Sequence, residues 1–268
     1  MTLTLLLDLD DTLLNTNLEA FIPAYFKALA KELSPHVAPE LMLGSLVSGT
    51  HLMTESEDFS RTLSQVFYDE FYSKINVPDA VLRPVIENFY DNVFPNLSHL
   101  TSPKPDAQEF VAWAKSKGYR IGIATDPLLP RKATFHRLRW AGFDPHEFEL
   151  VSTFENFHFS KTHPAYYAEV LGRMGWPDGP ILMVGNDMDR DIEPAKRLGL
   201  ATYLVDEKPG SNPDLEPGVR GSLADLRLWL DTADLDALIP SYKSIDSILS
   251  ILAATPASLK GFLARLMW

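Results

Sequence analysis

The sequence predicts an α/β protein built on a parallel sheet, with a helical segment inserted after the first strand. Short apolar runs alternate along the chain with segments that carry apolar residues at helical spacing. Several of these runs end in acidic or other polar residues, as expected where the strands of an open sheet meet a ligand. About 110 residues separate the first two runs, many more than a crossover helix requires.

The first strand is expected at residues 3–7, an apolar run too short to form an independent helix. It leads directly into a turn that contains Asp8, Asp10, Asp11 and Thr12. Ligands of open parallel sheets bind beyond the carboxyl ends of the strands. This turn is therefore a candidate site.

Beyond the turn the pattern becomes helical, and Asn17 is expected to cap the first helix. Further helices are predicted at about 39–53, 58–75 and 79–93, joined by short polar or proline-containing turns. We expect residues 17–101 to form an all-helical cap beside the carboxylates. Four aromatic residues lie close together in the third helix, and we interpret them as packed cap core rather than a substrate platform: Phe67, Tyr68, Phe71 and Tyr72.

The rest of the chain alternates between strands and helices, which predicts right-handed crossovers in one parallel sheet. Strands are expected at 119–124, 149–152, 181–184 and 201–205, and helices at 104–117, 131–141, 164–174, 192–198 and 222–230. We assign residues 1–16 and 102–234 to this core. Residues 206–218 have the composition of a loop, and residues 235–268 are expected to form a helical C-terminal extension that packs on the core or mediates a dimer contact.

The composition restricts the partners and the location of the protein. The 268 residues carry a formal net charge of −12, which disfavours nucleic acid and anionic membranes as partners. The chain has no cysteine, which is consistent with a reducing cytoplasm. We find no export signal and no apolar run long enough to span a membrane. We therefore expect a cytoplasmic monomer or homodimer.

Polar clusters follow three of the predicted strands, and Lys161 follows a fourth. If these strand ends share one edge of the sheet, six carboxylates approach one another: Asp8, Asp10, Asp11, Asp187, Asp189 and Asp191. Each pair of like charges at about 4 Å costs about 4 kcal/mol at an effective dielectric near 20. One lysine cannot offset this repulsion. Oxygen ligands point to a hard cation, Mg²⁺ or Ca²⁺, rather than to zinc or copper.

Four motifs in sequence order resemble those of the haloacid dehalogenase superfamily, in particular its phosphohydrolases with a helical cap between the first two motifs. The motifs are residues 8–12 (DLDDT), residues 121–125 (IGIAT), Lys161 within residues 160–164 (SKTHP), and residues 184–187 (VGND) extending to Asp191. The resemblance spans residues 1 to about 230. It implies a Rossmann-like, doubly wound core with strand order 3-2-1-4-5.

The resemblance also implies a Mg²⁺-dependent phosphatase that acts on a small phosphorylated metabolite. Asp8 would attack the phosphoryl group and form a phosphoaspartate, while Asp10 would transfer protons. Thr125 and Lys161 would bind and neutralise the phosphoryl group, with Asp126 beside them. Residues in the ligand set for Mg²⁺ would be Asp8, Asp10 through its backbone carbonyl, Asn186, Asp187 and Asp191.

Two positions depart from the commonest pattern of the superfamily. Asn186 stands where an acid usually follows the glycine of the fourth motif, and Asp126 stands where asparagine is common. Either change would lower activity, so a catalytically weak relative that binds a metabolite or partner is an alternative. Dehalogenation is a further alternative, although that reaction requires neither a proton-carrying Asp10 nor a metal.

Overall fold

The protein is described here by a computed structural model that defines residues 2–206 and 219–240. Its six-stranded sheet has the order β5-β4-β1-β6-β7-β8, and every neighbouring pair is parallel. The strands are β1 (Thr4–Leu7), β4 (Arg120–Ile123), β5 (Leu150–Val151), β6 (Ile181–Gly185), β7 (Ala201–Val205) and β8 (Arg220–Gly221). The predicted order 3-2-1-4-5 is confirmed for the first five of these strands. The sixth was not predicted, because Arg220 and Gly221 do not belong to an apolar run.

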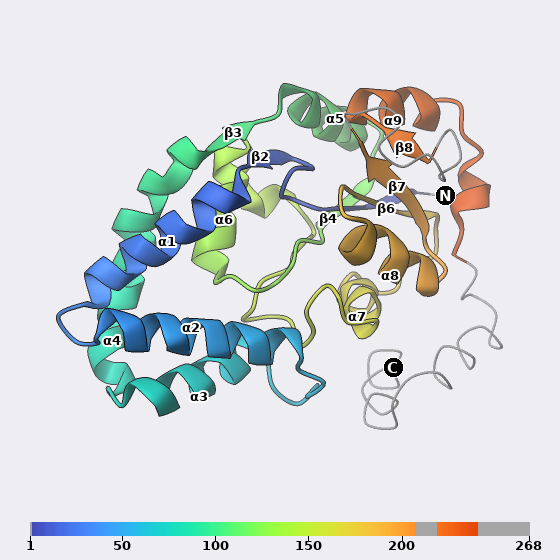
Figure 1. Ribbon diagram of the computed structural model, residues 1–268. Coiled ribbons are helices and arrows are strands. Elements are labelled where there is room, and N and C mark those ends of the chain that lie inside the picture. The colour runs from blue at the N-terminus through green and yellow to red at the C-terminus, as the bar shows by residue number, and fades with distance from the viewer. Residues whose placement is uncertain (1, 207–218, 241–268) are drawn as a thin grey trace.

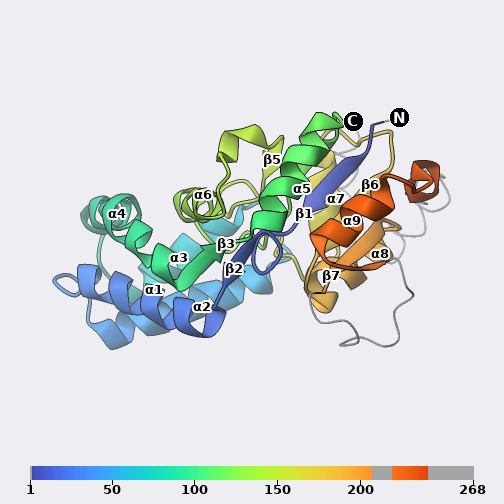
Figure 2. The ribbon, with the colours of Figure 1, turned by 90° about the horizontal axis from the view of Figure 1, so that it is seen from above.

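Helices cover both faces of the sheet. Successive residues of a strand point to opposite faces, so neighbouring residues of one strand pack against different helices. Leu5 and Leu7 of β1 pack in one hydrophobic cluster, and Leu6 packs in another. The first cluster includes residues of α5 (Pro105–Ser116) and α9 (Leu223–Leu230), which lie side by side in both views (Figures 1 and 2). The second cluster includes residues of α7 (Ala165–Arg173) and α8 (Glu193–Arg197). The sheet is therefore doubly wound, as predicted.

A group of helices between β1 and β4 lies to the side of the sheet (Figure 1). It contains α1 (Leu18–Leu33), α2 (Pro39–Thr54), α3 (Leu63–Ile75) and α4 (Asp79–Asn88), followed by a π-helix at Phe89–Val93 and a 3-10 helix at Phe94–Leu100. These helices share a third hydrophobic cluster, which also receives Ala133 from α6 (Arg131–Trp140). Most of the predicted helices are confirmed, as is the Asn17 cap, whose side chain accepts a hydrogen bond from the Ala20 amide at 3.1 Å.

The start of α3 and the two ends of the helical group differ from the prediction. Helix α3 begins at Leu63 rather than near Asp58, because Thr62 and Gln65 form a capping box there. A two-stranded antiparallel ribbon of β2 (Leu14–Thr16) and β3 (Thr101–Pro103) leads the chain into the helical group and out again. Three-residue strands are too short for an alternating pattern to reveal them. The domain boundaries near residues 17 and 101 remain predictions.

The C-terminal predictions fall largely outside the described residues. Residues 207–218 of the predicted loop and residues 241–268 of the predicted extension are not described. Within the extension, Leu235–Leu238 forms a short 3-10 helix after α9. Over residues 2–206 and 219–240, every helix is too short or too polar to cross a membrane.

Candidate active site

The carboxyl ends of β1, β4 and β6 meet at one edge of the sheet. Leu7 is the register partner of both Ile123 and Val184, so the residues that follow these three strands lie at the same level. The Asp8 amide donates a hydrogen bond to the Val184 carbonyl at 2.9 Å, which fixes the backbone where β1 ends. Asp8 is only 6% exposed. The sheet thus fixes the position of the Asp8 carboxylate at the carboxyl end of β1.

Lys161 joins two carboxylates that are far apart in the sequence. Its ammonium lies 2.6 Å from Asp8 Oδ1 and 2.5 Å from Asp191 Oδ1, and the lysine is almost fully buried. Burial favours a lower pKa for Lys161, but the charges of Asp191 and Asp8 outweigh it and hold that pKa well above its usual value. Burial raises the pKa of Asp191, and Lys161 opposes the shift. The fixed cation therefore offsets the charge of Asp8.

Gly185 leaves the space that Asp191 occupies. A Cβ atom on Gly185 would overlap the Asp191 carboxylate. The same carboxylate accepts a hydrogen bond from the Asp187 amide at 2.9 Å. The glycine of the fourth motif is thus required for the close approach of the acid to the end of β6.

Two oxygen atoms converge on the hydroxyl group of Thr12. The Thr12 Oγ1 atom lies 3.1 Å from Asp8 Oδ2 and 3.2 Å from Asn186 Oδ1, within donating distance of both. A hydroxyl group has one proton and can donate it to only one of them at a time. The other oxygen is then left without this proton. Asp8 and Asn186, from the ends of β1 and β6, both line the pocket described below, and carboxylate and amide oxygens are ligands that a hard cation such as Mg²⁺ accepts.

The six carboxylates do not form one close cluster, although all of them except Asp189 line the same pocket. Asp11 and Asp187 instead bind nearby backbone amides, those of Thr16, Asp189 and Arg190. In residues 2–206 and 219–240, no three acidic, histidine or cysteine side chains gather closely enough to hold a metal. The repulsion anticipated from the sequence is relieved mainly by salt bridges and by local capping of the helix and turn.

Asp10 forms an ion pair with Arg137, a residue that sequence reasoning missed. Arg137 belongs to α6, is 5% exposed, and lies over the Phe21 ring at 5.4 Å from its centroid. Burial lowers the pKa of Arg137 to about 10, which still leaves it charged at neutral pH, and Asp8 opposes the shift. One signal pointed to this arginine: at helical spacing it falls on the same face as Ala133 and Ala141, both fully buried.

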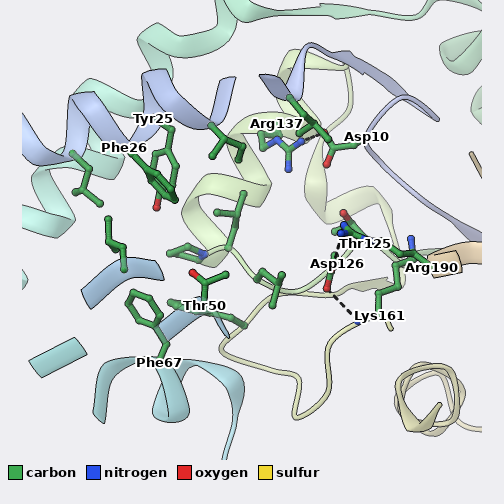
Figure 3. Close-up of a pocket in the computed structure, with 18 of the residues that line it drawn as sticks. Asp10, Tyr25, Phe26, Thr50, Phe67, Thr125, Asp126, Arg137, Lys161 and Arg190 are labelled. Atoms are coloured by element: carbon green, nitrogen blue, oxygen red, sulfur yellow. Dashed lines mark hydrogen bonds and ion pairs between the residues drawn. The ribbon is translucent and has the colours of Figure 1, made fainter. Parts of the chain in front are cut away.

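Thr125 and Asp126 follow β4, as predicted, and both line the site. The Thr125 carbonyl accepts hydrogen bonds from Ser152 at 2.6 Å and from Tyr166 at 2.8 Å, which holds the backbone in place. Asp126 Oδ1 accepts a hydrogen bond from the Lys161 amide at 3.1 Å (Figure 3). Burial raises the pKa of Asp126, and this hydrogen bond opposes the shift. Asp126 therefore anchors the segment that carries Lys161.

These residues line one end of a pocket of about 330 Å³, called here the site pocket. Its other end is formed by helices α1 to α4 and the π-helix, and Figure 3 shows Tyr25, Phe26 and Phe67 across the space from Asp10, Thr125 and Lys161. Phe67, Tyr68 and Phe71 all line this space. They were expected to be only packed core, and they serve as pocket wall too.

Comparison with protein families gives a consistent result. The family model for the haloacid dehalogenase-like hydrolases matches residues 2–199 of the chain. The chain is also similar to a glyceraldehyde 3-phosphate phosphatase of Methanocaldococcus jannaschii, with 32% identity over 106 residues, or 40% of this chain and 45% of that protein. A phosphoserine phosphatase of Thermus thermophilus is 29% identical over 121 residues, or 42% of this chain and 47% of that protein. These matches span about half the length of the relatives.

Solved structures share the fold. A 2-haloacid dehalogenase from Pseudomonas syringae pv. Tomato superimposes with a TM-score of 0.58 at 20% identity, covering 86% of this chain and 99% of that one. A haloacid dehalogenase-type phosphatase from Thermococcus onnurineus gives a TM-score of 0.52 at 19% identity, covering 86% and 98%. Identities this low establish the architecture, while the chemistry must be argued from the site.

Proposed function

Because the chain belongs to the haloacid dehalogenase-like hydrolases, we propose that it hydrolyses phosphomonoesters of small metabolites through a phosphoaspartate on Asp8. One observation carries the proposal: a buried carboxylate at the end of β1 is held by a fixed ammonium at 2.6 Å and faces a pocket. The names of the phosphatases that match part of the chain support the same reaction.

In the first step, an oxygen atom of Asp8 attacks phosphorus, and the bond from phosphorus to the ester oxygen breaks. Asp10 gives its proton to the departing alkoxide, which leaves as the alcohol. Lys161 offsets the negative charge on Asp8 and on the phosphoryl oxygens, and Thr125 donates its hydroxyl proton to one of them. In the second step, Asp10 takes a proton from water, which attacks phosphorus and releases phosphate and free Asp8.

The ion pair between Asp10 and Arg137 sets a condition on this mechanism. Asp10 must leave Arg137 and hold a proton before it can serve the leaving group, because a guanidinium favours the ionised carboxylate. This pair favours a second candidate function, a catalytically weak member of the family that binds phosphate esters. The uncharged Asn186 in place of an acid favours it as well.

We propose Mg²⁺ as the cofactor. Asp8 and Asn186 supply the two converging oxygen atoms, and the Asp10 carbonyl, Asp187 and Asp191 complete the ligand set that the family resemblance implies. When bound, the ion adds positive charge at the phosphoryl group. A cytoplasmic location and a monomeric or homodimeric state also remain proposals, supported by the cysteine-free sequence for the first.

The decisive experiment measures phosphate release from a broad panel of phosphomonoesters, with Mg²⁺ and with EDTA. We expect turnover only with Mg²⁺, and we expect Asp8→Asn to reduce it by at least 10³-fold while the circular dichroism spectrum stays unchanged. Turnover that survives Asp8→Asn would overturn the mechanism. Calorimetric binding without phosphate release would establish the weak relative instead, and halide release from a haloacid without Mg²⁺ would establish a dehalogenase.

A further inference from the structure

We infer that the site takes phosphomonoesters whose alcohol portion is apolar, such as alkyl phosphates, in preference to those of polar metabolites. The inference rests on the proposed phosphatase function and specifies its substrate class. It comes from the unequal lining of the site pocket, in which polar and charged side chains occupy the end beside Asp8 and apolar ones occupy the other.

The helical end contributes no charge to the lining. Residues 17–101 are all described, and the pocket residues that they supply are Leu18, Ile22, Tyr25, Phe26, Leu29, Leu33, Leu46, Thr50, Phe67, Tyr68, Phe71, Ile86 and Tyr90. Every charged residue that lines the pocket comes from the core or from the turn after β1, so it lies toward the phosphoryl end. An ester bound with its phosphoryl group at Asp8 would therefore place its organic part against apolar side chains.

The most deeply buried hydroxyl groups at the apolar end are already paired. Tyr25 and Tyr90 share a hydrogen bond of 2.7 Å between their hydroxyl groups and are 5% and 6% exposed. This bond uses one of the two hydroxyl protons, so the pair leaves a ligand only one proton to accept. Thr50 and Tyr68 are the other residues with hydroxyl groups in the helical part of the lining. This is a sparse set of partners for a polar metabolite.

Burial makes this lining selective. An amine, carboxylate or hydroxyl group that loses its water against leucine and phenylalanine pays a desolvation penalty unless it finds a partner. A methylene group in the same place gains from leaving water, by up to about fourfold in binding for each one buried. The substrates in the names of the matched phosphatases, glyceraldehyde 3-phosphate and phosphoserine, carry polar groups of the first kind.

A homologous series tests the inference. Ethyl, butyl, hexyl and octyl phosphate have primary alcohols as leaving groups, so their chemical reactivity is nearly the same. We expect kcat/KM to rise about tenfold or more from ethyl to hexyl phosphate, measured with Mg²⁺ below micelle-forming concentrations, and to exceed the values for glyceraldehyde 3-phosphate and phosphoserine. Phosphate release without this rise, or with a preference for the polar esters, overturns the inference and leaves the phosphatase function standing. No release from any ester overturns both.

A matched pair of variants locates the effect in the pocket. Ile22 of α1 lines the site pocket and is 37% exposed, so Ile22→Asn should fold. It should lower the ratio of kcat/KM for octyl over ethyl phosphate at least fivefold. Leu41 of α2 has a similar exposure of 44% and does not line the pocket, so Leu41→Asn should leave the ratio unchanged. An equal loss in both variants, or in neither, contradicts an apolar subsite at this wall.

Discussion

The two ends of the site pocket are stabilised by different interactions. At the core end, Lys161 pairs with two buried carboxylates, and the buried Arg137 pairs with the partly buried Asp10. At the helical end, apolar and aromatic side chains pack against one another, as Phe67 and Phe71 do at a centroid distance of 5.5 Å. Removal of one partner of a buried ion pair leaves the other charge without compensation, whereas removal of a few atoms from packed side chains loses only their contacts. Loss of one charged group at the core end should therefore cost more than loss of one small group at the helical end.

Removal of the Lys161 charge should have the largest effect. Lys161→Met leaves Asp8 and Asp191 buried and unpaired, and it should lower the free energy of unfolding by about 3–5 kcal/mol and abolish phosphate release. Lys132 provides a matched control, because its ammonium also contacts two carboxylates, those of Glu87 and Asp91, but is 41% exposed. Lys132→Met should cost at most about 1 kcal/mol. Equal losses in urea unfolding would show that burial does not distinguish the two sites.

Substitutions of two glycines compare the core end with the helical part of the protein without changing any charge. Gly185→Ala places a methyl group where the Asp191 carboxylate lies, and it should cost about 1–3 kcal/mol and reduce kcat/KM at least tenfold. Gly44 in α2 has open space around it, so Gly44→Ala should raise stability by about 0.5–1 kcal/mol with no loss of activity. Thermal unfolding and steady-state kinetics measure both effects. An unchanged Gly185→Ala variant would mean that Asp191 has room to move.

The same distinction explains which parts of the site could be predicted from the sequence. Asp8, Lys161 and Asp191 lie together as expected, because parallel strands and the motif order place their segments at one edge of the sheet. The pairing of Asp10 with Arg137 depends on how α6 packs against the helical group, and no local pattern encodes that packing. The six-carboxylate cluster failed for a local reason: an acid before a helix, such as Asp187, caps the helix.

The fold shows a similar division. Helical periodicity identified the longer helices, and short apolar runs identified five strands, of which β1 and β6 are buried along their whole length. The strands β2, β3 and β8 were missed, because their two or three residues form no apolar run and are defined by their strand partners. The start of α3 was misplaced because Asp58 and Thr62 are both suitable N-caps, and only the reciprocal bonds with Gln65 decide between them.

The smallest expected effect lies at the helical end, in the hydroxyl pair of Tyr25 and Tyr90. Tyr25→Phe leaves the Tyr90 hydroxyl buried without its partner at 2.7 Å, and it should cost about 1–2 kcal/mol in urea unfolding. Tyr90→Phe should cost a similar amount. The double variant removes both hydroxyl groups and keeps both rings in the aromatic cluster, so its loss should be smaller than the sum of the two single losses.

Tyr119→Phe controls for the loss of a half-buried tyrosine hydroxyl group outside the pocket and should change stability by less than about 0.5 kcal/mol. Additive losses in the Tyr25 and Tyr90 cycle would mean that the two hydroxyl groups do not bind each other. The apolar end of the site pocket would then offer hydrogen bonds to a ligand, and the contrast between its two ends would be weaker. Coupling of about 1 kcal/mol would instead show that the two hydroxyl groups are bonded to each other, which leaves few polar groups at that end for a ligand.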